Sequence, residues 1–242
     1  MNVLVLTGAG ISAESGIPTF RDADGLWEGH RAEEVATPEA FSANPALVHR
    51  FYNQRRRRVQ EADIGPNEAH LALAEFESNF HDAFGGRFLL VSQNVDNLHQ
   101  RAGSKNLLSM HGELLKARCS RTGDVFEWSE DLTSETPHPD RPDLVGTLRP
   151  HIVWFGEMPM GMDRIETAAA EADLFIAIGT SAVVYPAAAF VDWTPSSCYR
   201  IEINMQDTPV SEKFDETIRG KASVEVPKLL HRIETSGLPA KH

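Results

Sequence analysis

Cysteine, positive charge and long hydrophobic runs are all scarce in this chain, and each shortage argues against a class of protein. The 242 residues include only two cysteines, Cys119 and Cys198, which are far apart and indicate no disulfide framework. No apolar run approaches the ~20 residues of a membrane span, and Met1 leads almost directly into an apolar segment without the pattern of a signal peptide. We therefore expect a cytoplasmic protein.

Acidic residues outnumber basic ones, 35 to 23, which gives a formal net charge of −12. This excess disfavours binding to duplex DNA, whose phosphates attract Lys and Arg. It suits the capture of basic protein tails, although a charged surface also serves simply to keep a globular protein in solution. The chain is long enough for one large domain with a smaller inserted one.

The most informative segment is a glycine-rich turn that follows a short apolar strand. Val3–Thr7 has the composition of a buried parallel strand, and the next residues read Gly-Ala-Gly-Ile-Ser-Ala. Gly8 allows a tight turn, Gly10 lets the backbone approach a pyrophosphate, and Ala13 permits close packing of helix on strand. The N–H groups at the helix start attract the anion. A polar extension, Glu14–Arg21, goes beyond what a phosphate-binding turn needs.

Other blocks carry polar or small residues where strands end. Phe88–Ser92 reads as a buried strand that runs into the polar loop Gln93–His99, and Met110-His111-Gly112-Glu113 follows shortly after. Ile176-Ala177-Ile178 ends in a second small-residue turn, Gly179-Thr180-Ser181. Open α/β sheets bind ligands at the carboxyl ends of their strands, so these loops predict one shared site.

A dinucleotide-binding dehydrogenase would show a second strand soon after the turn, with an acidic residue about 20 positions on for the ribose. The sequence pattern of residues 27–78 predicts helices instead. A hydride-transferring dehydrogenase is therefore the least favoured function. Thr37-Pro38 and Asn44-Pro45 are helix starts with proline at the first position, and Asn67–Phe80 is a further helical segment. A run of arginines, Arg55–Arg58, is typical of a solvated helix face, which we expect for most of the four.

A second insertion spans residues 113–150. It contains the strand candidates Leu114–Cys119 and Asp124–Trp128, and the α/β pattern returns with Ile152–Phe155. The later elements that we predict are a helix at Asp163–Glu171, strands at Asp173–Gly179, Tyr199–Asn204 and Ala222–Val226, and a final helix at Pro227–Glu234.

The predicted fold is α/β, with a Rossmann-like parallel sheet in a large domain and a smaller lobe made of a helical insertion and a second insertion. The nucleotide-binding domain comprises residues 1–26, 79–112 and 151–242, and the small lobe comprises 27–78 and 113–150.

The blocks described above, in this order, together with Arg149–Glu157 and Ile203-Asn204, closely resemble the sirtuin family of NAD-dependent protein deacylases. The resemblance spans nearly the whole chain and extends to the bacterial branch of deacetylase- and desuccinylase-like enzymes. It implies NAD⁺ as co-substrate and the acylated lysines of proteins as substrate. In that reaction the acyl oxygen attacks the ribose C1′ and nicotinamide leaves. A ribose hydroxyl then attacks the resulting O-alkylamidate, water completes the step, and the products are free lysine and O-acyl-ADP-ribose.

The resemblance assigns the catalytic roles to His111, Asn94 and Asp96. Imidazole titrates near neutrality, so His111 can act as general base on a ribose hydroxyl. His99 is the rival, but we expect a structural role for it. Asn94 and Asp96 would form the nicotinamide pocket through their amide and carboxylate groups. The alternative for both is simple turn formation after the strand.

The residues that the resemblance implies for cofactor binding lie in the glycine-rich turn, the extension after it, the polar loop and the two later strand ends. Phe20 would shield C1′ from water and Arg21 would contact phosphate, whereas ordinary core packing is the alternative for Phe20. The full set is Gly8, Ala9, Gly10, Ser12, Ala13, Glu14, Thr19, Phe20, Arg21, Trp27, Gln93, Asn94, Val95, Asp96, His111, Gly179, Thr180, Ser181, Asn204, Met205, Gln206 and Ala222.

The substrate-binding residues implied by the resemblance are Tyr52, Arg55, Ile152, Val153, Phe155 and Gly156. The last four would form an edge to which an extended peptide adds, although a plain core strand would look the same. Tyr52 and Arg55 share one helical face and can bind the distal carboxylate of a succinyl or malonyl group. Ala32 or Ala36 would leave room for that larger group.

The chain departs from the family at the structural zinc, which is usually held by two Cys-x-x-C pairs. Only Cys119 is present, because Thr122 stands at the partner position and residues 123–150 contain no cysteine. Four thiolates cannot be assembled, and Cys119 with His138 and Asp140 would be a poor ligand set, so we expect no zinc. The lobe would then depend on packing, through Val125, Phe126, Trp128, Leu132 and Leu144.

Two alternatives remain open for the function. One is a protein mono-ADP-ribosyltransferase on the same scaffold, which the intact His111, Asn94 and Asp96 argue against. The other is a non-catalytic module that binds NAD or ADP-ribose. We expect no nucleic-acid or membrane partner, and a monomer.

Overall fold

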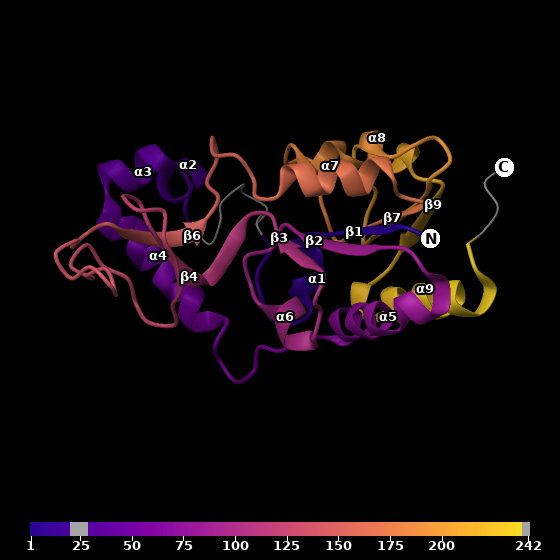
Figure 1. Ribbon diagram of the computed structural model, residues 1–242, viewed down its shortest axis with the longest axis horizontal. Helices are drawn as coiled ribbons and strands as arrows, with labels where there is room; N and C mark the ends of the chain where they lie inside the picture. The colour runs from indigo at the N-terminus through magenta and orange to yellow at the C-terminus, as the bar shows by residue number, and fades with distance from the viewer. Residues whose placement is uncertain (20–28, 239–242) are drawn as a thin grey trace.

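The computed structural model describes residues 1–19 and 29–238. The molecule is elongated, with a parallel sheet covered by helices at one end and a smaller lobe at the other (Figure 1). The candidate residues Phe20, Arg21 and Trp27 lie outside the described residues.

The large lobe is built on a six-stranded parallel sheet in the order β3-β2-β1-β7-β8-β9. Short, mostly apolar segments form its central strands, as the sequence predicted. The bounds are β1 Val3–Thr7, β2 Phe88–Ser92, β3 Leu107–Ser109, β7 Leu174–Ile178, β8 Tyr199–Asn204 and β9 Glu216–Arg219. The fold class is therefore confirmed as Rossmann-like α/β.

Both faces of this sheet are buried, because helices cover each of them (Figure 1). Along β1, Val3 and Val5 join one apolar cluster, whereas Leu4 and Leu6 join another on the opposite face. The covering helices are α1 Ala9–Ala13, α5 Glu68–Phe84, α6 Leu98–Ala102, α7 Met162–Ala170, α8 Phe190–Trp193 and α9 Ala222–Ser236.

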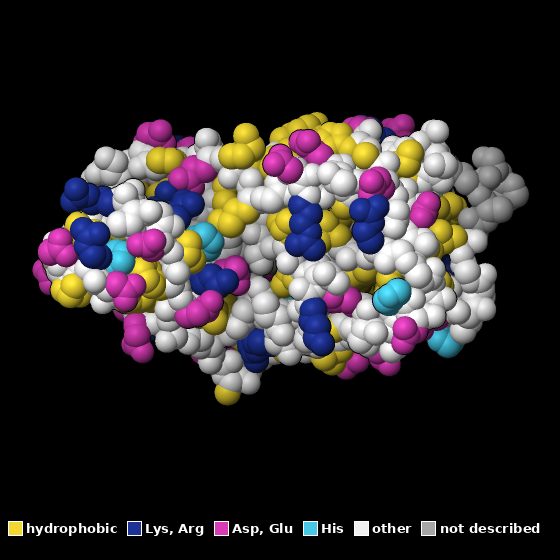
Figure 2. All heavy atoms as spheres, viewed as in Figure 1, with side chains coloured by type: hydrophobic (Ala, Val, Ile, Leu, Met, Phe, Trp, Pro, Cys, Tyr) yellow, Lys and Arg dark blue, Asp and Glu magenta, His cyan; other side chains and the backbone are white. Residues whose placement is uncertain are grey.

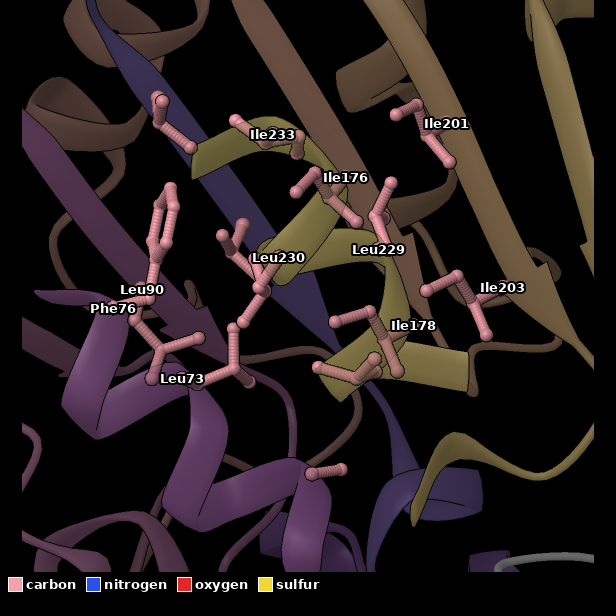
Figure 3. Packing of buried hydrophobic residues seen from close by; sticks show 14 of the residues in the cluster. Leu73, Phe76, Leu90, Ile176, Ile178, Ile201, Ile203, Leu229, Leu230 and Ile233 are labelled. Atoms are coloured by element: carbon pink, nitrogen blue, oxygen red, sulfur yellow. The ribbon is translucent and has the colours of Figure 1, made fainter. Parts of the chain in front are cut away.

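Figure 3 shows how α5 and α9 fill one of these faces. Leu73 and Phe76 of α5 and Leu229, Leu230 and Ile233 of α9 pack with isoleucines of the sheet, and every member of this set is almost fully buried. Burying a large aliphatic side chain contributes roughly 1.5–3 kcal/mol, so this interface is a main source of stability for the nucleotide-binding sheet.

The segment before α5 is helical, as predicted, and forms one part of the small lobe. It contains α2 Ala32–Val35, α3 Pro38–Ala43 and α4 Pro45–Arg58. The side chains of Thr37 and Asn44 accept hydrogen bonds from the backbone N–H groups of Ala40 and Leu47, so both predicted helix starts are confirmed.

The second part of the small lobe is a three-stranded antiparallel sheet in the order β5-β4-β6. Its strands are β4 Gly112–Cys119, β5 Val125–Glu127 and β6 Leu148–Ile152. The prediction that the α/β pattern returns at Ile152–Phe155 is wrong, because Ile152 ends β6 and pairs with Gly112 of β4. Leu132 packs in the core of this sheet, but Val125 is exposed on its edge strand.

The predicted strand at Ala222–Val226 is also wrong. These residues open α9, and the sixth strand of the sheet is β9, Glu216–Arg219. Val224 and Val226 favour a strand locally, but Val226, Leu229 and Ile233 recur at helical spacing and pack on the sheet. Pro227 lies inside this helix.

The arginine run is not a solvated face as a whole. Arg57 is exposed, but Arg55 is 7% exposed and Arg56 is fully buried. Arg56 donates to the backbone oxygen of Leu114 at 2.9 Å and to Asn53 Oδ1 at 2.7 Å. These bonds offset the cost of burying the cation and join α4 to β4. Burial lowers the pKa of Arg56 to about 10, so it stays charged at neutral pH.

Within the described residues, no helix is both long and apolar enough to cross a membrane. Figure 2 shows Lys and Arg side chains interspersed with Asp and Glu over both lobes on the face drawn.

Candidate functional site

A cavity of about 700 Å³ lies at the carboxyl ends of β1, β2, β7 and β8 and extends to the small lobe. Apart from Gln206, every described candidate residue lines it. These are Gly8, Ala9, Gly10, Ser12, Ala13, Glu14, Thr19, Tyr52, Arg55, Gln93, Asn94, Val95, Asp96, His111, Ile152, Val153, Phe155, Gly156, Gly179, Thr180, Ser181, Asn204, Met205 and Ala222. Gln206 is exposed on the adjoining loop.

The two small-residue turns pack directly against each other. The N–H of Gly8 donates to the Ile178 oxygen at 3.0 Å, and the N–H of Gly10 donates to the Gly179 oxygen at 2.9 Å. A Cβ on Gly10 would lie 2.7 Å from Gly179 Cα. Gly10 is thus required by the contact between turns, and its N–H is taken up by that contact, not directed at a ligand.

A polar cluster lies between the first turn and the loop after β2. Ser12 donates from Oγ to Asp96 Oδ2 at 2.9 Å, and Asn94 Nδ2 donates to Ser12 Oγ and to the Gly8 oxygen, both at 3.1 Å. Burial raises the pKa of Asp96, although bonds from Leu98 N–H and Ser12 oppose this shift. The cluster holds Asn94 and Asp96 in fixed positions on the cavity wall.

His111 lies at the junction of the two lobes, immediately before β4. Its Nδ1 is 2.9 Å from the backbone oxygen of Gln93. A carbonyl only accepts, so Nδ1 carries the proton and Nε2 keeps its lone pair. Burial lowers the pKa of His111, and the Gln93 carbonyl partly offsets this. The result is a neutral imidazole in the cavity that can accept a proton.

His99 lies behind this wall. Its Nε2 is 3.1 Å from Thr7 Oγ1, and its ring packs at 4.7 Å against that of His70. Burial holds the pKa of His99 well below its ordinary value. These contacts fit the structural role expected for it. His70 was not predicted near the site, because no local pattern connects a residue of α5 with the first turn; its Nε2 lies 3.5 Å from Ser12 Oγ.

The second turn joins the far end of the cavity to the polar loop. Thr180 accepts from Gln93 Nε2 at its Oγ1, 3.0 Å away, and from Asn204 Nδ2 at its backbone oxygen, 2.7 Å away. Glu14 lies on the same wall and accepts from the backbone and side chain of Ser223. Residues at the carboxyl ends of β1, β2, β7 and β8 therefore line one cavity, as predicted from the parallel pattern.

The small-lobe end of the cavity is aromatic, and two arginines of α4, Arg55 and Arg58, also line the cavity. Tyr52 and Arg55 both face it from α4, and Ala36 lines it beside them. Arg55 lies over the Phe51 ring, 3.1 Å from guanidinium carbon to centroid, and donates to the Phe51 oxygen at 2.7 Å. Burial raises the pKa of Tyr52, which keeps the phenol protonated.

The segment after β6 crosses the cavity between the lobes. Val153 N–H donates to the His111 oxygen, and Phe155 N–H donates to the Ala36 oxygen, both at 2.9 Å. Arg149 and Glu157 form a bidentate pair at 2.6 and 2.9 Å beneath this turn. Val184, Tyr185 and Pro186 also line the cavity and were not predicted, because this segment contains no polar motif.

Cys119 and His138, which the sequence suggested only as poor zinc ligands, form hydrogen bonds with other residues. Cys119 Sγ is 3.4 Å from Thr147 Oγ1, and His138 Nε2 is 3.3 Å from Asp124 Oδ2. The N–H of Asp140 donates to His138 Nδ1, so Nε2 carries the proton toward Asp124. Among the residues that the structure describes, no three His, Cys, Asp or Glu side chains are grouped to hold a metal.

Comparison with known proteins agrees with this geometry. Residues 8–186 match the model of the Sir2 family. An NAD-dependent protein deacylase of Rhodopirellula baltica is 64% identical over 96% of this chain and 98% of its own length. A protein of the same name from Escherichia coli is 54% identical over 96% of this chain and 81% of its own.

Solved structures give the same result. A mutant Sir2 homologue in complex with ADP-ribose superposes with a TM-score of 0.86 at 38% identity, covering 99% of this chain and 94% of that one. A Sir2 homologue in complex with NAD gives 0.84 at 40% identity, covering 98% and 90%. The match spans both lobes and the cavity between them, and the chain therefore belongs to the Sir2 family, the sirtuins.

Proposed function

We propose that this protein is an NAD-dependent protein-lysine deacylase that removes acetyl groups and also succinyl and malonyl groups. The observation that carries the proposal is His111, a neutral imidazole fixed by Gln93 in the cavity that also contains Asn94 and Asp96. Membership of the Sir2 family and the names of its relatives, NAD-dependent protein deacylases, support deacylase activity.

NAD⁺ fits the cavity as co-substrate, because the polar cluster of Ser12, Asn94 and Asp96 lies at one part of it and Thr180 with Asn204 at another. NAD⁺ supplies the ribose carbon that receives the acyl oxygen when nicotinamide leaves. Asp96 and Asn94 would hold the nicotinamide end, and the second turn with Asn204 and Ala222 would hold the adenosine end.

His111 then supplies the proton transfer. Its Nε2 would accept the proton of a ribose hydroxyl, which activates that hydroxyl toward the bound acyl group. The Gln93 carbonyl stabilises the imidazolium that results, because it accepts from Nδ1 in both protonation states. The hydroxyl attacks the acyl carbon, water completes the step, and the products are free lysine, nicotinamide and O-acyl-ADP-ribose.

Arg55 is the group that would recognise an acidic acyl chain. Arg55 lines the cavity, so the distal carboxylate of a succinyl or malonyl group bound there would form a charge-assisted pair with it, whereas an acetyl group carries no such anion. Tyr52 lies on the same helix face and would donate to the same carboxylate.

Acylated lysines of proteins would enter along the segment Ile152–Gly156. A solved Sir2 bound to acetylated peptide superposes with a TM-score of 0.76 at 26% identity, covering 98% of this chain. We place the reaction in the cytoplasm, whose reducing conditions suit the two buried cysteines, Cys119 and Cys198.

The test is nicotinamide release with acetyl-lysine and succinyl-lysine peptides, using wild type, His111→Ala and Arg55→Met. We expect turnover of both peptides by wild type, loss of both in His111→Ala, and selective loss of succinyl turnover in Arg55→Met. A folded wild type that binds NAD⁺ but releases no nicotinamide with either peptide would reject the proposal and favour a binding module. Transfer of labelled ADP-ribose to protein would favour the transferase.

A further inference from the structure

Glu202 is a buried carboxylate that the proposed reaction does not use. It lies on β8, two residues before Asn204, and its side chain is only 1% exposed. An acidic side chain so deeply buried requires partners, because desolvation of a lone carboxylate is costly. Those partners come from the two chain segments that lead to and from the adenosine end of the cavity.

The first segment is the loop after β8. Glu202 Oε1 accepts from Thr208 Oγ1, and Oε2 accepts from Ser211 Oγ, both at 2.6 Å. The N–H of Thr208 in turn donates to Ser211 Oγ at 2.8 Å. The loop from 205 to 211 thus folds back over the carboxylate of the strand that precedes it.

The second segment is β9. Arg219 Nη2 donates to Glu202 Oε2 at 2.8 Å, while its Nε donates to Asp207 Oδ1 at the same distance. Arg219 therefore joins the loop and β9 to one buried anion. Charge-assisted hydrogen bonds of this kind are the stronger class in proteins.

Both segments continue directly into the cavity wall. Met205 begins the loop, and Lys221 and Ala222 follow Arg219; all three line the cavity. The N–H of Gly220 donates to the Asn204 oxygen at 3.1 Å, and Asn204 itself is bonded to Thr180. The wall that would meet adenosine is therefore held from behind by Glu202.

We infer that Glu202 is a positioning residue for the adenosine half of NAD⁺, an inference that rests on the proposed function. The carboxylate fixes Met205 and Ala222 before the nucleotide arrives, which lowers the ordering cost of binding. It touches neither the lysine substrate nor the reacting carbon. Its loss weakens the binding of every ligand that carries ADP-ribose and leaves the chemical step intact.

The experiment measures the affinity of ADP-ribose by calorimetry, together with kcat and the two KM values, in four variants. Glu202→Gln removes the charge, and Thr208→Val removes one hydroxyl donor at nearly constant shape. Thr208→Ser keeps that hydroxyl. Arg232→Gln breaks a different exposed ion pair, with Glu216 of β9, and serves as the control.

We expect the affinity for ADP-ribose to fall, and the KM for NAD⁺ to rise, by about tenfold in Glu202→Gln and about threefold in Thr208→Val. Thr208→Ser and Arg232→Gln should match wild type, and kcat and the peptide KM should stay within about twofold throughout. Unchanged ADP-ribose affinity in Glu202→Gln and Thr208→Val would overturn the inference. If Glu202→Gln does not fold, Thr208→Val against Thr208→Ser decides. Wild type that binds neither NAD⁺ nor ADP-ribose would instead reject the proposed function.

Discussion

The indole N–H of Trp154 donates a hydrogen bond to the hydroxyl oxygen of Tyr52 at 3.0 Å, joining residues 102 positions apart. Because the indole can only donate, the phenolic oxygen is the acceptor and its proton points elsewhere. The bond fixes the Tyr52 hydroxyl on the cavity wall beside Arg55. Trp154 is held in turn by Arg149, whose guanidinium carbon lies 3.4 Å from the indole centroid.

Tyr52→Phe should therefore discriminate between acyl groups. Loss of a hydrogen bond to a charged group costs about 1.5–3 kcal/mol, so kcat/KM for a succinyl peptide should fall about 10- to 100-fold. The acetyl peptide should stay within about threefold, because acetyl carries no distal carboxylate. Parallel assays of the two peptides test this. An equal fall for both would mean that Tyr52 acts on the shape of the cavity and not on the acyl charge.

The pH dependence should report His111. Burial lowers its pKa below the ordinary value of 6.5, and a general base works only when neutral. Activity is therefore full at neutral pH and is lost as pH falls through that lowered pKa, so the acid limb of kcat/KM should lie below pH 6.5. A limb centred above 6.5 would contradict the burial of this imidazole.

His111→Ala should lower kcat by about 100-fold or more while NAD⁺ still binds.

The buried histidines outside the cavity predict acid sensitivity of the fold. Burial lowers the pKa of His49 and of His70 to about 4. The unfolded chain takes up these protons near pH 6.5, so between 6.5 and 4 it binds more protons than the native state, and stability falls as pH falls. Each residue should cost of order 2–3 kcal/mol at pH 4.

Urea unfolding at pH 7 and pH 5 measures this effect. His49→Phe removes one titrating group and should reduce the difference between the two midpoints. The ring of Phe41, which packs edge-on against His49, remains a suitable neighbour. Equal midpoints at the two pH values in wild type would show that these side chains are hydrated.

The small lobe should not depend on a metal. A structural zinc contributes about 10 kcal/mol or more to a small module, so its removal would lower Tm sharply. In this chain Cys119 bonds to Thr147 and Arg56 joins α4 to β4, so a chelator should change Tm by less than about 2 °C. Calorimetric scans with and without chelator test this, with metal content measured on the same sample.

Arg56→Met should destabilise the protein through the same lobe. The substitution leaves the Leu114 oxygen without this buried donor, at about 1–3 kcal/mol, whereas Asn53 Oδ1 still accepts from the Leu132 N–H. Arg57→Met changes an exposed neighbour and should be nearly neutral, since its ion pair with Asp131 is largely solvated. Similar denaturation midpoints for the two variants would rule out Arg56 as the joint between α4 and β4.

Local patterns were sufficient for most of the fold. Val3–Thr7 and Phe88–Ser92 are confirmed at both bounds, because an apolar run of five residues between turn signals is long enough for a buried strand. The strand prediction for Ala222–Val226 was wrong. Its valines favour a strand locally, but the apolar residues of α9 recur at helical spacing and pack on the sheet as a helix. Ile152–Phe155 failed because no local pattern says which sheet a strand joins.

The candidate site was predictable where its residues belong to motifs and not where they depend on distant partners. Asn94, Asp96 and His111 stand in short polar blocks at strand ends. The sequence did not distinguish the buried Arg56 from its exposed neighbour Arg57. Arg56 is buried through a hydrogen bond to Leu114, which is 58 positions away. Tertiary contacts of this kind leave no periodic signal in the chain.

The order of the strands has a consequence for engineering. β1 and β2 are neighbours in the parallel sheet, yet the whole segment carrying Tyr52 and Arg55 is inserted between them. The strands whose ends line one part of the cavity and the helix that carries Tyr52 and Arg55 therefore belong to separate segments of the chain. The segment that ends with α4 could be exchanged between relatives to retarget the enzyme to other lysine modifications, while the sheet that serves NAD⁺ is left as it is.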